Sequence, residues 1–167
     1  MEISIKSMVM LGAVLLTGLS AGLFYAWSVS VIPGTQKVAH QTYLETMQSI
    51  NRAILNPYFF AVFFGSIILL GMATVYEFHG NKTVFWLLLV ASISYLAGTI
   101  GVTGLGNVPL NNQLDVVDLT QMELSKLQDF RQFYEKNWNR LHQIRTGFAV
   151  LAFLLALMAV MVGSNKP

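Results

Sequence analysis

Four long stretches of this chain contain no aspartate, glutamate, lysine or arginine, and they constrain the fold more than any other feature. They are Ser7–Gln36, Ala53–Tyr76, Thr83–Leu114 and Thr146–Asn165. A helix that crosses a membrane needs about 20 mostly apolar residues, and each stretch is long enough to provide one. Only 11% of the residues are charged, whereas a soluble domain has about 25%. The sequence therefore predicts an integral membrane protein.

The predicted fold is all-α, an integral membrane four-helix bundle that forms a single domain over residues 1–167. The four spans are expected near Met8–Val31, Tyr58–Tyr76, Val84–Gly104 and Gly147–Val162. We expect the first span to be retained, because its apolar core exceeds the roughly 7–15 residues of a signal peptide. The pI near 9.0 is explained by basic residues that flank the spans. No nucleic-acid motif is recognisable, and the absence of cysteine excludes thiolate metal sites.

The connection between spans one and two predicts a short amphipathic helix over Thr42–Leu55. Thr42-x-x-Glu45 has the spacing of a capping box, which satisfies free backbone donors where a helix starts. Apolar residues then recur at helical spacing. Asn56-Pro57 should end the helix, because a residue before proline avoids the helical conformation.

The connection between spans three and four predicts a longer helix that runs into the fourth span without a break. It should start near Gln121, at a second capping box formed by Thr120-x-x-Glu123. Its apolar stripe consists of Leu127, Phe130, Tyr134, Trp138 and Leu141. The bundle is thus expected to carry two additional amphipathic segments, one between each outer pair of spans.

The two halves of the chain follow the same order of features. Each has an apolar segment, a break expected at a proline, an amphipathic stretch that contains an Asn-Arg pair, and a second apolar segment. The prolines are Pro33 and Pro109, and the pairs are Asn51-Arg52 and Asn139-Arg140. This order is typical of a parallel repeat about an axis along the membrane normal. The polar inserts should then lie on one side of the membrane and face each other.

Basic residues are more numerous in the two long connections than on the side of the termini. This distribution predicts that the long connections lie in the cytoplasm, in what we expect to be a bacterial inner membrane. Small residues at Gly18-x-x-x-Gly22 and Ala97-x-x-x-Gly101 favour close helix packing, within the chain or in a homo-oligomer.

His142 is the strongest candidate for chemistry, because imidazole exchanges protons near neutral pH. Asn139, His142 and Arg145 are spaced by three residues and share one helix face. Trp138 lies on a neighbouring stripe. A charge at the start of a span is costly unless it is paired or functional, which favours a role for Arg145. Tryptophan and arginine are also typical of interfacial anchors, so an anchoring role is the alternative.

Asparagines and glycines at the end of the third predicted span suggest the wall of a polar pocket. The stretch is Gly104-x-Gly106-Asn107-x-Pro109-x-Asn111-Asn112. Asn51 and Arg52 should face it from the first half. Capping of helix ends explains the same residues without any ligand. One further alternative is a haem or metal held jointly by His40 and His142, which fall on the same side.

Four separated motifs, in order, resemble those of a known family. They are Leu19–Gly34, Met47–Arg52, Gly106–Asn111 and Trp138–Thr146. The chain resembles bacterial membrane proteins of unknown function that are grouped with the fungal anthrone oxygenases. The resemblance covers essentially the whole chain and implies a four-helix membrane bundle. For the fungal relatives it also implies oxidation of a polycyclic anthrone to an anthraquinone by dioxygen, without an obvious conventional cofactor.

The resemblance implies a mechanism in which these polar residues act on a substrate. His142 would remove a proton from a lipophilic aromatic substrate, and Arg145 and Asn139 would stabilise the anion that then reacts with dioxygen. The remaining substrate-binding candidates are Asn51, Arg52, Asn107, Asn111, Trp138, Arg140, Trp27 and Tyr25. The cofactor stays open between none and a metal. The competing hypothesis is a non-enzymatic membrane subunit or binding module.

Overall fold

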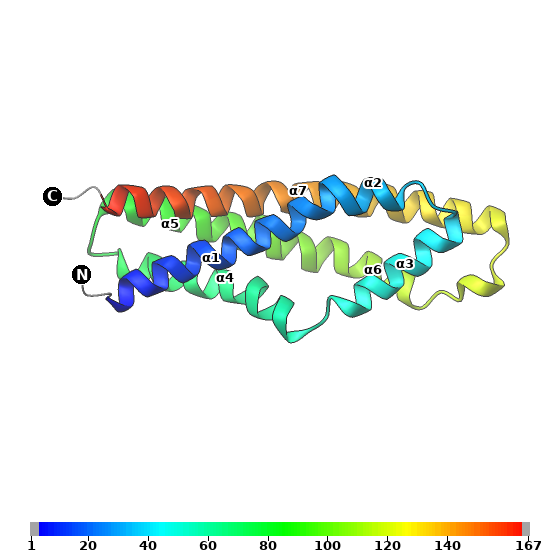
Figure 1. Ribbon diagram of the computed structural model, residues 1–167, viewed down its shortest axis with the longest axis horizontal. Helices are drawn as coiled ribbons and strands as arrows, with labels where there is room; N and C mark the ends of the chain where they lie inside the picture. The colour runs from blue at the N-terminus through cyan, green and yellow to red at the C-terminus, as the bar shows by residue number, and fades with distance from the viewer. Residues whose placement is uncertain (1–3, 165–167) are drawn as a thin grey trace.

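The computed structural model describes residues 4–164, and every regular element in that range is helical. Four helices are long and apolar enough to cross a membrane: Ile5–Thr35, Pro57–Tyr76, Lys82–Asp115 and Leu124–Ser164. The protein is therefore a multi-pass membrane protein, and the predicted four-helix bundle is confirmed. Both ends of the described chain lie at one end of an elongated bundle (Figure 1), as four crossings require.

Two of these long helices pass through a proline where the sequence predicted a break. The first consists of α1 (Ile5–Ala26), a π-helical segment (Trp27–Val31) and α2 (Ile32–Thr35). Proline in an α-helix lacks a donor and clashes with the carbonyl four residues earlier. Here the N–H of Ile32, just before Pro33, donates to the Trp27 carbonyl five residues back. This wider turn makes room for the ring, so the expected break is wrong.

The third long helix accommodates Pro109 in the same way. It consists of α5 (Lys82–Ile93), π-helical segments over Ser94–Gly101 and Thr103–Asn107, and α6 (Val108–Asp115). The N–H of Val108 donates to the carbonyl of Thr103, again five residues back. The polar residues up to Asn112 thus lie within a helix and not beyond its end. The two halves share a five-residue π-helical segment directly before an aliphatic residue and proline, and such segments often mark functional sites.

The other elements begin differently from their predicted caps. The amphipathic helix is confirmed as α3 (His40–Ala53), but Ala39 precedes it without a side-chain cap, so Thr42 lies inside the helix and its predicted capping box is wrong. In the second connection Asp118 accepts hydrogen bonds from the Thr120 backbone and hydroxyl, which lower the pKa of its carboxyl group. The capping box at Thr120 is therefore wrong as well. Asn56 does cap the second span, α4 (Pro57–Tyr76), through the N–H of Phe59.

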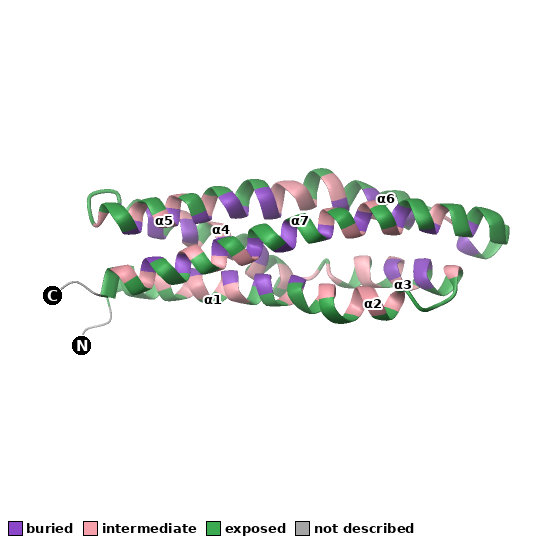
Figure 2. Cartoon of the chain, turned by 90° about the horizontal axis from the view of Figure 1, so that it is seen from above, coloured by how far each residue is buried: buried purple, intermediate pink, exposed green. Residues whose placement is uncertain are grey.

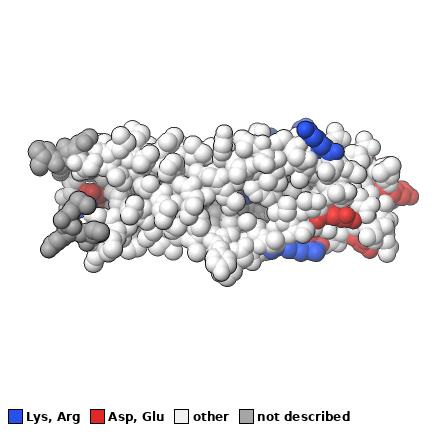
Figure 3. All heavy atoms as spheres, viewed as in Figure 1, with Lys and Arg blue, Asp and Glu red and all other residues white. Residues whose placement is uncertain are grey.

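Helix α7 (Leu124–Ser164) starts three residues later than predicted and runs without a break, as expected. Its 41 residues correspond to about 60 Å at 1.5 Å per residue, about twice the hydrocarbon thickness of a bilayer. Most of the charged side chains visible in Figure 3 lie toward the end of the molecule opposite the termini, which matches a protruding end.

Buried residues line the inner faces of the helices along the whole molecule (Figure 2). They form two cores. The first lies between the spans, with small residues of α7 such as Ala149, Ala152 and Ala156 facing α1 and α5. The second lies in the protruding end, where α3, α6 and α7 meet. It consists of Tyr43, Leu44, Met47, Leu110, Leu114, Leu119, Leu127, Tyr134 and Trp138.

Close packing of glycines follows the predicted motifs only in part. Gly18 is closely packed, as its motif predicted, and lies against Phe153, but a Cβ at Gly22 would meet nothing within 4 Å. On the third helix the tightest contact is at Gly98, where a Cβ would overlap the Phe148 ring, and Gly106 lies close to Leu141.

Gly98→Ala is expected to destabilise the bundle by about 1–3 kcal/mol, because the added methyl group must displace Phe148 in a packed interface. The measurement is the midpoint of thermal unfolding in detergent. Gly104→Ala on the same helix is the control, since a Cβ there meets nothing within 4 Å. Equal midpoints for the two variants would show that Phe148 does not require a glycine.

Candidate functional site

A cavity of about 170 Å³ lies where the two cores meet, and both halves of the chain line it. The first half contributes the end of α1, the end of α3 and the start of α4, and the second half contributes α6 and α7. Its wall is largely apolar and aromatic, with a few asparagines and charged groups. The lining residues used below are Phe24, Trp27, Asn51, Arg52, Phe59, Asn111, Asp115, Trp138 and Arg145.

His142 lies behind this wall and is fully buried. The Trp138 ring stacks on the imidazole at 5.1 Å between centroids with 7° between the planes. The ring centroids of Trp27 and Phe24 lie 6.2 Å and 6.0 Å from that of the imidazole. His142 does not line the cavity, so the side chains between it and a ligand are Trp138, Trp27 and Arg145.

The hydrogen bonds of His142 fix its proton on Nε2. Arg145 donates from Nη2 to Nδ1 at 3.0 Å, and its Nε lies 3.3 Å from the same atom. A guanidinium group can only donate, so Nδ1 must accept. Nε2 lies 3.1 Å from the Phe24 carbonyl oxygen and donates to it, with the Ser28 hydroxyl at 3.0 Å. The lone pair that a general base would use is therefore already occupied.

Arg145 is the charged group in contact with the cavity that is most deeply buried. It is 8% exposed, and its guanidinium carbon lies 4.7 Å from the Phe24 ring centroid and 5.0 Å from that of Trp138. No carboxylate of residues 4–164 forms an ion pair with it. A buried charge without an ionic partner is costly. The cation–π contacts and the imidazole acceptor offset only part of that cost.

Asparagines from the two halves meet at one hydrogen-bonded tyrosine. Asn51 donates to the Tyr134 hydroxyl at 3.0 Å, and this hydroxyl donates to Asn111 Oδ1 at 3.0 Å. Asn111 also accepts from Trp138 Nε1 at 2.9 Å. Asn107 donates to the Trp138 carbonyl, while its own Oδ1 is buried without a partner among the described residues. The two polar inserts therefore face each other, as predicted. Their hydrogen bonds hold the Trp138 indole in place over His142.

Five of the predicted site residues do not line the cavity: His142, Asn107, Tyr25, Arg140 and Asn139. Tyr25 is 60% exposed, because it follows Phe24 by one residue and so points about 100° away around the helix. Arg140 is exposed for the same reason, two residues after Trp138. Asn139 is half-buried but neither lines the cavity nor forms a side-chain hydrogen bond with another described residue.

Arg52 reaches the cavity rim with a partner that the sequence did not indicate. Its Nε donates to Asp115 Oδ1 at 2.6 Å and thereby links α3 to α6. A signal for Asp115 did exist: Arg52 is the last charge before the second uncharged stretch, and Asp115 is the first after the third. Phe24 and Ser28 gave no signal within their apolar run.

His40 and His142 do not approach each other. His40 begins α3 two residues after Val38, whose carbonyl accepts a hydrogen bond from Arg131. Arg131 precedes His142 by 11 residues on α7, which is roughly 16 Å of helix. Ligands of one ion lie within about 2–3 Å of it. No group of three or more histidines, cysteines or acidic residues with metal-site geometry occurs within residues 4–164. The geometry thus argues against a shared haem or metal.

Comparison with known proteins confirms the family resemblance, but over a shorter range than the four motifs, since Leu19–Gly34 and Met47–Arg52 lie outside the match. A family model described as anthrone oxygenase matches residues 58–155. The match extends from α4 into the apolar half of α7 and includes Asn107, Asn111, Trp138, His142 and Arg145. No curated protein and no solved structure matches the chain.

Proposed function

This chain belongs to the anthrone oxygenase family, and we propose that it is a membrane oxygenase that oxidises a lipophilic polycyclic aromatic substrate with dioxygen. The observation that carries the proposal is the buried guanidinium of Arg145 at the wall of an aromatic cavity. Trp27, Phe59 and Trp138 provide flat apolar surfaces for fused rings. A positive charge fixed at such a wall stabilises negative charge that develops on a bound substrate.

The position of the cavity suits a substrate that dissolves in lipid. The cavity lies at the junction between the apolar spans and the protruding end of the bundle, and its apolar wall includes the first turn of α4. A polycyclic substrate would enter with its rings against Phe59 and its polar oxygen toward Arg145. Arg52 and Asp115, which are exposed at the rim, would leave a path for water and protons.

The chemistry balances without a further reactant, as anthrone illustrates. Loss of one proton from the CH₂ carbon, to water at the rim, gives an enolate whose oxygen lies against Arg145. The enolate transfers one electron to dioxygen, and the two radicals combine to form a peroxide at that carbon. Protonation of the peroxide and loss of water break the O–O bond and the remaining C–H bond. The carbon keeps one oxygen atom as the quinone carbonyl, and water carries the other.

His142 is assigned a positioning role in this scheme and not the role of the base. Its Nδ1 holds the guanidinium of Arg145, and its Nε2–H is held by the Phe24 carbonyl. The imidazole thus holds Nε and Nη2 of Arg145 and leaves Nη1 of this cavity-lining side chain without a partner among residues 4–164. The enolate would be stabilised by a charge that does not have to reorganise during the reaction.

The test is oxygen consumption by the protein in lipid nanodiscs with anthrone as the substrate. We expect uptake above the rate of empty nanodiscs, one ¹⁸O atom from ¹⁸O₂ in the anthraquinone, and the same rate after treatment with a metal chelator. Arg145→Met should lower the rate by about 100-fold or more, the usual effect of losing an oxyanion donor. Arg140→Met, on an exposed position of the same helix, is the matched control. Binding of anthrone without oxygen uptake would favour a binding module instead.

We further propose that the cavity faces the cytoplasm of a bacterial inner membrane. Arg131 and Arg145 are buried and held by other side chains, so they do not count as topology signals. The remaining basic residues still favour the long connections: Lys37, Arg52, Lys126, Lys136 and Arg140 against Lys6, Lys82 and Lys166.

A further inference from the structure

The guanidinium group of Arg145 at the cavity wall has no negatively charged neighbour among the side chains that contact it. From α1 it meets Phe24, and on its own helix its neighbours are His142 and Trp138. Tyr134, one turn before Trp138 on α7, uses its hydroxyl to donate to Asn111. None of these groups carries a negative charge near neutral pH.

The other charges that line the cavity already neutralise each other. Arg52 and Asp115 form an ion pair at 2.6 Å on the rim, where both side chains are about half exposed or more. The net charge that the cavity offers a ligand is therefore the positive charge of Arg145. Its Nη1 group forms no hydrogen bond with another residue in the range 4–164, whereas Nε and Nη2 are directed at His142.

From this arrangement we propose that the cavity binds its ligand as an anion, an aromatic enolate, phenolate or carboxylate, with Arg145 as the buried counter-ion. The proposal rests on the proposed function for the aromatic scaffold of the ligand, but the anionic form follows from the cavity itself. An anion would supply the partner that the buried guanidinium lacks, and the fused rings would lie between Trp27, Trp138 and Phe59. A neutral ligand of the same shape would leave the charge uncompensated.

A buried positive charge changes the acidity of a bound ligand, whether or not that ligand reacts with dioxygen. A positive charge within about 4–6 Å of an acid lowers the pKa of that acid by about 1–3. A phenol bound against Arg145 should therefore ionise at lower pH than the same phenol in water.

The experiment uses 2-hydroxyanthraquinone, whose visible absorption moves to longer wavelength when its single phenol ionises, as a probe without a CH₂ group to oxidise. The dye is titrated with the full-length protein in nanodiscs over a range of pH. We expect the bound dye to be half ionised at least about one pH unit below the free dye in empty nanodiscs, which is a tenfold preference for the phenolate. Anthraquinone without the hydroxyl group should bind at least about tenfold more weakly.

Three variants distinguish the effect of the Arg145 charge from that of the shape of the cavity. Arg145→Met keeps the length of the side chain but removes the charge, and the bound dye should then ionise no more easily than the free dye. Arg145→Lys should restore part of the preference, and Arg140→Met, at an exposed position that does not line the cavity, should leave it unchanged. A bound dye that stays neutral at the pH where free dye ionises would overturn the proposal with the wild-type protein alone. An unchanged preference in Arg145→Met would also overturn it. If the protein prefers the phenolate of the dye but consumes no oxygen when anthrone is supplied, only the proposed reaction is rejected.

Discussion

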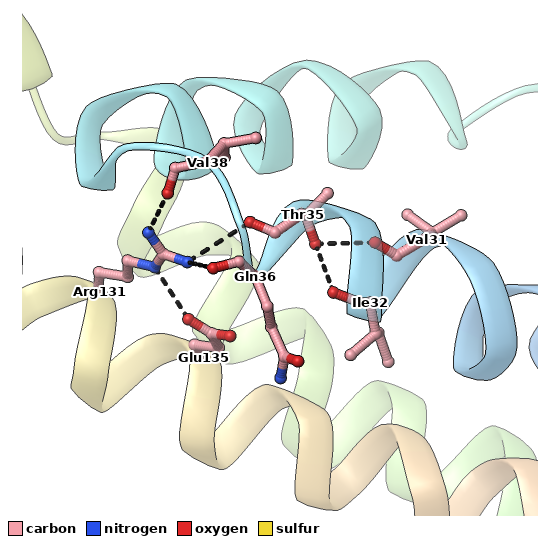
Figure 4. Close-up of polar contacts among 7 residues, drawn as sticks. All are labelled: Val31, Ile32, Thr35, Gln36, Val38, Arg131 and Glu135. Carbon is pink, nitrogen blue, oxygen red and sulfur yellow. Dashed lines mark hydrogen bonds and ion pairs between the residues drawn. The ribbon is translucent and has the colours of Figure 1, made fainter.

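Arg131→Met is expected to destabilise the protruding end of the molecule by about 3–5 kcal/mol, the usual effect of removing one partner from a buried ion pair. Arg131 is 7% exposed. Its Nε donates to Glu135 at 2.9 Å, and its terminal nitrogens donate to the carbonyls of Val38 at 2.7 Å and Gln36 at 3.0 Å (Figure 4). The substitution would leave a poorly solvated carboxylate and two carbonyls without their donor.

The same guanidinium joins the first helix to the layer formed by α3 and α7. Its central carbon lies 4.4 Å from the centroid of the Tyr43 ring. Burial raises the pKa of the Tyr43 hydroxyl group, which therefore stays protonated. Arg131 thus satisfies carbonyls at the end of the long first helix and packs on the first turn of α3. A single side chain thereby fixes the loop that carries Lys37 between these two helices.

Tryptic cleavage after Lys37, which is exposed, measures this effect in nanodiscs. Cleavage should be faster in Arg131→Met by at least about 100-fold if the loop opens with the expected loss of free energy. Arg140→Met, an exposed arginine nine residues further along α7, is the control and should be cut at the wild-type rate. Unchanged cleavage in Arg131→Met would mean that the packing of Tyr43 and its neighbours holds the loop without the arginine.

The spans and the long α7 could be predicted because one strong physical signal defines them. A bilayer excludes charge, so an uncharged run of about 20 residues already specifies a crossing helix. The ends of helices α1 to α3 and α5 to α7 were less predictable. The prolines were expected to break helices, but π-helical turns before Pro33 and Pro109 let the helices continue. Such turns depend on what the neighbouring helix packs against and leave no periodic pattern in the sequence.

Part of the site could be predicted because apolar stripes define the two amphipathic inserts. Asn51, Asn111 and Trp138 converge because the two amphipathic inserts pack on each other, and that packing followed from their apolar stripes. Tyr25 and Arg140 were placed by their nearness in sequence to site residues, and nearness in sequence does not decide which side of a helix a residue occupies. The sequence also could not show that Arg145 lies between His142 and the cavity.

This order of residues allows the role of His142 to be tested with two substitutions. His142→Phe keeps an aromatic ring against Trp138 but removes both the acceptor that holds Arg145 and the donor to Phe24. Because the guanidinium would lose its fixed position, we expect the rate with anthrone to fall by about 100-fold. The preference for the phenolate of 2-hydroxyanthraquinone should fall as well, while the protein remains folded.

His142→Asn should behave differently, because the amide oxygen lies near the place of Nδ1 and can still accept from Arg145. We expect this variant to keep its rate within about tenfold of wild type and to keep the same pH–rate profile. A general base cannot be replaced by an amide, which takes up no proton at neutral pH. If His142 removed the substrate proton, both variants would lose the rate to the same extent, and the limb of the profile that reports its ionisation would disappear. Rescue by asparagine with an unchanged profile would therefore assign to His142 the positioning of Arg145.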